Sequence, residues 1–137
     1  MRAVLDPNVI ISAALSPGGS PGRLFRYWFE GAYDLVVSPL LLDELGPALG
    51  YSKLRDQVPT NEAKELLELL SRAGLATEDP LSPVDIQSPD PDDDYLIALA
   101  NIARAVLVSG DKDLLGLSGQ IPVYSPAEFV ALIEASS

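Results

Sequence analysis

The chain has 137 residues and a formal net charge of −11, and it contains no His and no Cys. This length suits one domain with a substantial core, so we predict a single domain over residues 1–137. The lack of Cys excludes disulfides and thiolate metal sites, and the lack of His removes the commonest general base and the Ser-His-Asp triad. Any catalysis must therefore use carboxylates, Ser, Lys or metal-bound water.

Apolar runs and the distribution of charge set expectations for location and partners. No apolar run approaches the roughly 20 residues of a membrane span, and no leader sequence opens the chain, so we expect a cytoplasmic protein without a membrane partner. The acidic residues are concentrated in the second half, which argues against tight, non-specific binding of long nucleic-acid duplexes. The cations best placed to contact substrate phosphates are Arg2, Arg23, Arg26, Lys53 and Arg55.

The first part of the chain alternates apolar strands with helices. Residues 3–6 (AVLD) fit a short buried strand, and residues 8–15 fit an apolar helix that the turn sequence SPGGSPG ends. A second helix over residues 23–30 and a second strand over residues 34–38 (DLVVS) follow. Ser38 is suited to cap the helix that starts after it.

The middle of the chain is dominated by two helical patterns. Residues 60–73 form an amphipathic pattern, with Leu on one side and Glu, Lys and Arg on the other. Residues 74–91 are rich in Pro, Ser and Asp and fit an extended connection. Residues 92–104 are apolar nearly all round after the first turn, which is typical of a helix buried against a sheet.

The last part returns to the alternation of strand and helix. Residues 105–109 (AVLVS) and 121–125 (IPVYS) fit strands, and a closing helix over residues 126–134 is capped by Ser125. Each predicted strand is a continuous apolar run, which is typical of strands buried on both faces. We therefore predict an α/β fold, with a central parallel sheet of four to five strands and helices on both faces.

Acidic residues gather at the edges of these predicted elements. The clusters are Asp6, Asp43 with Glu44, the run Asp92-Asp93-Asp94, and Asp111 with Asp113. Each cluster alone has an ordinary explanation, such as helix capping, a favourable charge in a first helical turn, or a surface turn. Crowded carboxylates stay ionised when a cation shares the site, and oxygen-only ligands favour Mg²⁺ or Mn²⁺. Together the clusters favour shared metal coordination.

A set of sequence segments, in order and spacing, carries a family resemblance over nearly the whole chain. The segments are VLDPNVIISAAL, SPGG, LVVSPLLLDEL, PDPDDDYLIALA, and VLVSGDKDLLGL before IPVYSPAEF. They resemble a PIN domain of the small prokaryotic toxin type. The resemblance implies a PIN-like domain that acts as a metal-dependent endoribonuclease, commonly the toxin of a type II toxin-antitoxin pair. It also implies an RNA substrate, Mg²⁺ or Mn²⁺ as cofactor, a cognate antitoxin as partner, and a homodimer.

The same resemblance assigns roles to individual residues. By position, the metal-binding and catalytic acids are Asp6, Glu44, Asp94 and Asp111. Asp113 is expected to assist the metal through water, and Asn8 and Ser109 match supporting polar positions. The family usually has Asp-Thr-Asn where this chain has Asp6-Pro7-Asn8. Pro7 lacks the Thr hydroxyl and the backbone N–H, so another residue would have to make any hydrogen bond that those groups make in the family.

Two other functions remain open on the sequence. One is phosphotransfer through an aspartyl phosphate on Asp6, although a haloacid-dehalogenase-type site would place another Asp where Asn8 stands. The other is a non-catalytic PIN-like binding module, whose acids hold a structural ion or a basic partner peptide. For the endoribonuclease, attack of water on the RNA phosphate predicts products with 5′-phosphate and 3′-hydroxyl ends. Products with 2′,3′-cyclic phosphate would exclude that mechanism.

Overall fold

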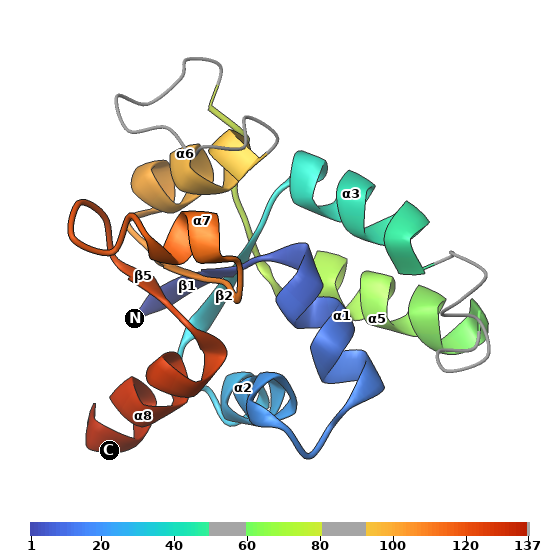
Figure 1. Cartoon of the computed structure of the whole chain (residues 1–137). Helices are drawn as coiled ribbons and strands as arrows, with labels where there is room; N and C mark the ends of the chain where they lie inside the picture. The colour runs from blue at the N-terminus through green and yellow to red at the C-terminus, as the bar shows by residue number, and fades with distance from the viewer. Residues whose placement is uncertain (50–59, 81–92, 137) are drawn as a thin grey trace.

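The computed structural model describes residues 1–49, 60–80 and 93–136, and their strands and helices alternate along the chain (Figure 1). The strands are β1 (Arg2–Leu5), β2 (Asp34–Val37), β3 (Leu75–Ala76), β4 (Val106–Val108) and β5 (Val123–Tyr124). The helices are α1 (Pro7–Leu15), α2 (Ser20–Phe29), α3 (Pro39–Leu49), α5 (Thr60–Ala73), α6 (Asp94–Ala103), α7 (Lys112–Leu115) and α8 (Pro126–Ser136).

The five strands form one parallel sheet with the order β3-β2-β1-β4-β5. Strand β1 is central, and Ala3 pairs with Leu35 of β2 on one side and with Val106 of β4 on the other. The chain first builds outward from β1 through β2 to β3, and then returns to the other side of β1 for β4 and β5. The strand order therefore reverses between β1 and β4, and in open α/β sheets ligands bind outside the carboxyl ends of the strands at such a reversal.

Both faces of the sheet are covered. Ala3, Val4 and Leu5 in β1 are all at most 1% exposed, and Leu35, Val36 and Val37 in β2 are at most 2% exposed. Because successive side chains of a strand point to opposite faces, three buried residues in a row require cover on both sides. This arrangement confirms the predicted parallel sheet flanked by helices. In the parts of the chain that the structure describes, no helix combines the length and apolarity needed to cross a bilayer.

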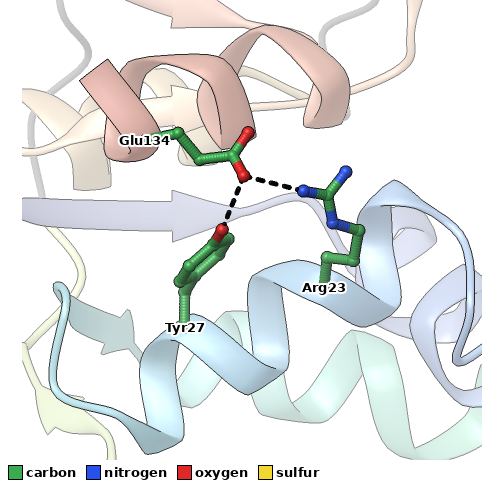
Figure 2. A network of polar contacts seen from close by, with 3 residues as sticks. All are labelled: Arg23, Tyr27 and Glu134. Carbon is green, nitrogen blue, oxygen red and sulfur yellow. Dashed lines mark hydrogen bonds and ion pairs between the residues drawn. The ribbon is translucent and has the colours of Figure 1, made fainter. Parts of the chain in front are cut away.

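Helix α8 packs beside α2, and a polar network crosses their exposed side (Figure 2). The Arg23 guanidinium forms an ion pair with the Glu134 carboxylate at 2.9 Å, and the Tyr27 hydroxyl donates to the same Glu134 oxygen at 2.8 Å. Arg2 donates to the carbonyl of Ala103 at 3.1 Å, at the last residue of α6. Two of the cations expected to contact phosphate therefore have partners within the fold, while Lys53 and Arg55 lie outside the described residues.

The boundaries of two elements differ from the sequence-based expectation. Helix α2 begins at Ser20 rather than Arg23, so the last three residues of the predicted turn SPGGSPG form its first turn. A Cβ at Gly22 would lie 2.0 Å from the Pro17 carbonyl oxygen, so this tight turn requires Gly. Strand β3 lies inside the predicted extended connection, where two residues are too few to show a strand pattern. The predicted start of α6 at Asp92 lies outside the described residues.

Candidate active site

Asp6 is the first residue after β1 and is only 5% exposed. It also caps α1, where Pro7 occupies the first helical position that its fixed φ angle suits. One carboxylate oxygen accepts the Asn8 N–H at 3.0 Å, and the other accepts the Ser109 hydroxyl at 2.8 Å. Burial raises the pKa of Asp6 above its ordinary value; the bonds from Asn8 and Ser109 oppose this rise, and the nearby charge of Asp111 adds to it.

The loop after β4 contacts Asp6 through Ser109. Ser109 is fully buried, and its Oγ donates to Asp6 while accepting the backbone N–H of Asp111 at 3.0 Å. Asp111 in turn caps α7, because its carboxylate accepts the Asp113 N–H at 2.8 Å. The Ser109 hydroxyl thus links the carboxyl ends of β1 and β4 and holds Asp111 near Asp6.

A solvent-open cavity of about 350 Å³ lies over this pair of acids. Its lining residues are Asp6, Asn8, Val9, Ser12, Pro21, Gly110, Asp111 and Pro126. They come from α1 and its cap, the first turn of α2, the loop after β4 and the first residue of α8. The cavity therefore lies at the reversal of strand order, and among the described residues Asp6 and Asp111 are the carboxylates that line it.

Glu44 and Asp94 stand on two helices that both begin at the carboxyl edge of the sheet. Glu44 is exposed on α3, and its carboxylate accepts a hydrogen bond from the Tyr95 hydroxyl of α6. Asp94 is the half-buried first residue of α6, next to Tyr95 in the chain. The pKa of Tyr95 is raised, first by burial, then by the hydrogen bond and charge of Glu44, and then by the charges of Asp6 and Asp79. Acids from three separate segments therefore add to the effect of burial on the pKa of Tyr95.

Sequence reasoning did not single out Tyr95 and Asp79 as site residues. Asp79 follows β3, and one of its oxygens accepts the Leu40 N–H at 3.0 Å in the first turn of α3. Its other oxygen is buried without a hydrogen-bond partner among the described residues. The sequence around Asp79 does not identify it as a cap, because the helix that it caps belongs to a distant segment. Tyr95 falls within an apolar pattern, so the sequence predicts only another residue of a buried helix.

The structure brings part of the predicted site together directly. Asp6, Asn8, Ser109 and Asp111 are joined by hydrogen bonds, and Asp113 is exposed beside them. Within residues 1–49, 60–80 and 93–136, no three Asp or Glu side chains lie close enough together to hold a metal ion. Asp6 and Asp111 still suit a hard divalent cation, because Mg²⁺ commonly binds through one or two carboxylates and keeps several waters. Metal binding by all four acids stays a prediction.

Comparisons with known proteins agree with this fold. The model of the family described as "PIN domain" matches residues 2–113. The uncharacterized protein MJ1680 of Methanocaldococcus jannaschii is 29% identical over 145 aligned positions, which cover 98% of this chain and 92% of that protein. The solved structure of PAE2754 from Pyrobaculum aerophilum matches with a TM-score of 0.66 at 17% identity, covering 98% of this chain and 90% of its own.

A second solved structure is VapBC2 from Rickettsia felis, bound to a DNA fragment from its promoter. It matches with a TM-score of 0.63 at 13% identity, covering 91% of this chain and 98% of the matched chain. At such identities the two solved structures establish similarity of fold alone.

Proposed function

The chain belongs to the PIN-domain family, whose members are generally nucleases, and from that premise we propose that it is a metal-dependent endoribonuclease. One observation carries the proposal. The buried polar side chains of the described residues are Asp6, Ser38 and Ser109, and they are the first residues after β1, β2 and β4. Burying polar groups costs free energy, and here that cost is concentrated at the edge of the sheet where ligands bind.

The proposed roles of the residues follow from their positions. Asp6 and Asp111 hold Mg²⁺ or Mn²⁺ at the cavity, and Glu44 and Asp94 add ligands from α3 and α6. When bound, the ion supplies an activated water and neutralises charge on the phosphate. The chain has no His to perform such tasks. The Ser109 hydroxyl and the Asn8 backbone N–H orient the Asp6 carboxylate. Asp113, exposed beside Asp111, assists through water.

We also propose that the protein is the toxin of a toxin-antitoxin pair in the cytoplasm. The similarity to a VapBC structure supports an antitoxin partner. The acidic cavity would attract Arg or Lys side chains of such a partner, because complementary charges favour association. Phe29, at the end of α2, is 62% exposed and stacks on Phe25, so this helix offers apolar surface for a second copy or for the antitoxin.

The test is cleavage of a pool of structured and single-stranded RNA by purified protein without its partner. Reactions contain Mg²⁺, Mn²⁺ or EDTA, and Asp94→Asn is compared with Asp43→Asn, an exposed acid on α3. We expect metal-dependent cleavage with 5′-phosphate and 3′-hydroxyl ends, lost in Asp94→Asn and retained in Asp43→Asn. Products with 2′,3′-cyclic phosphate would contradict the mechanism.

Two outcomes would point to the other functions. Mn²⁺ binding without cleavage, even after Pro7→Thr restores the usual family residue, would favour a non-catalytic binding module. Trapping of a phosphate analogue on Asp6 would favour phosphotransfer.

A further inference from the structure

Glu44 depends on another helix for its position. It lies exposed on α3, and a glutamate side chain has several freely rotating bonds, so α3 alone does not fix the direction of its carboxylate. The hydroxyl of Tyr95, on α6, donates to this carboxylate. The bond therefore joins the two helices that carry Glu44 and Asp94.

Tyr95 is suited to act as a fixed donor. Its side chain is partly buried, and its ring is carried by a helix whose next five residues, from Leu96 to Ala100, are buried. A phenol has one proton to donate, and here that proton is directed to Glu44. The carboxylate can accept several bonds at once, so this contact leaves Glu44 able to bind a further group.

The contact lies one residue from Asp94, which is assigned to the site. Burial and Glu44 raise the pKa of Tyr95, and the charges of Asp6 and Asp79 add to the rise. Asp79 also accepts the Leu40 N–H, so it attaches the first turn of α3 to the segment after β3. Tyr95 is therefore next to Asp94 in the chain, and the helix that carries Glu44 is held at its start.

We infer that Tyr95 is a positioning residue, whose hydroxyl holds the Glu44 carboxylate toward α6, the helix that begins at Asp94, so that Glu44 can share a divalent cation. This inference rests on the proposed function, since it concerns the same site. It differs from the family-level ligand assignment, because Tyr95 acts through Glu44 and touches neither metal nor substrate.

The test measures Mn²⁺ binding to the isolated protein by electron paramagnetic resonance, titrated into the millimolar range, without RNA. The variants are Tyr95→Phe, Glu44→Gln and the two combined. Tyr27→Phe is the matched control, because Tyr27 also donates to a Glu carboxylate, between α2 and α8 (Figure 2). Thermal unfolding of each variant checks that the fold is retained.

We expect Tyr95→Phe to weaken Mn²⁺ binding about 10-fold, the scale usual for a residue that orients a metal ligand, and Tyr27→Phe to leave it unchanged. Tyr95→Phe should have no further effect once Glu44→Gln is present. Full additivity of the two changes, or no effect of Tyr95→Phe on a wild-type protein that binds Mn²⁺, would overturn the inference. A protein that binds Mn²⁺ with this pattern but cleaves no RNA would refute only the nuclease, and one that binds no Mn²⁺ would refute both.

Discussion

The two edges of the parallel sheet use polar residues differently. At the amino edge, Arg2 and Asp34 open β1 and β2 with exposed side chains, and Arg2 donates to a helix carbonyl. At the carboxyl edge, Asp6 and Ser109 follow β1 and β4, are buried, and bond to each other. The amino edge thus uses its Arg for a structural contact, while the carboxyl edge buries a carboxylate whose pKa burial raises.

This difference indicates which edge carries function. A solvated charge at a strand end costs little, whereas a buried acid destabilises the fold unless something compensates. Two bonds to Asp6 compensate in part, and a cation at the cavity would compensate further. Matched substitutions at the two edges test this contrast.

The largest effect should come from removing one carboxylate at each edge. Asp6→Asn should lower RNA cleavage by roughly 100-fold or more, since it removes a charge at the reacting site. Asp34→Asn makes the same chemical change at the amino edge, where the side chain is exposed, and should leave the rate unchanged. Initial rates on one RNA substrate measure both. Equal losses in the two variants would mean that net charge, not position, controls activity.

A smaller effect should separate the two buried serines. Ser109→Ala removes the hydroxyl between Asp6 and the Asp111 N–H, and should lower cleavage about 10-fold, as expected for a group that orients a ligand. Ser38→Ala removes the cap that accepts the Leu41 N–H at 3.2 Å, and should instead cost about 1 kcal/mol of stability.

Urea denaturation and initial rates together distinguish these roles. A Ser109→Ala protein that is destabilised but cleaves RNA at the wild-type rate would refute the role given to Ser109.

The smallest effect concerns pH and stability without metal. Because burial raises the pKa of Asp6 above 3.8, the folded state binds this proton more tightly than the unfolded state. The contribution of Asp6 to stability therefore improves as pH falls through the raised pKa, and the penalty is greatest above it. Asn can still cap α1 but carries no charge, so Asp6→Asn should be more stable than wild type near neutral pH.

Urea midpoints in EDTA, compared at several pH values, measure this difference. The advantage of Asp6→Asn should shrink as pH falls toward 3.8. An advantage that grows on acidification would show that the pKa of Asp6 is lowered instead.

Much of the fold follows from patterns that are local in the sequence. Continuous apolar runs predicted β1, β2, β4 and β5, and the predicted caps were confirmed: Ser38 accepts the Leu41 N–H, and Ser125 accepts the Glu128 N–H at 3.1 Å. The predicted start of α2 was wrong. Pro and Gly are typical of a loop, but here they form the first turn of the helix. Strand β3 is too short for a pattern of its own and exists because it pairs with β2.

The part of the site that lies at the ends of neighbouring strands was predictable from the sequence. Asp6 and Asp111 follow two apolar strands, and the parallel sheet brings their carboxyl ends to one edge. The contacts of Tyr95 and Asp79 were not predictable, because each joins segments that are far apart in the chain. No local spacing encodes a hydrogen bond between a residue of α6 and a residue of α3.

The most direct test of the proposed metal site is the location of Mn²⁺ on the folded protein. Substoichiometric Mn²⁺ broadens the NMR signals of nearby amides, and assigned ¹H-¹⁵N spectra would identify which ones. A metal site at the cavity predicts that Asn8, Gly110 and Asp111 at the carboxyl edge broaden first, while Asp34 and Arg104 at the amino edge stay sharp. Broadening that is spread over the acidic surface, or that starts at the amino edge, would contradict it.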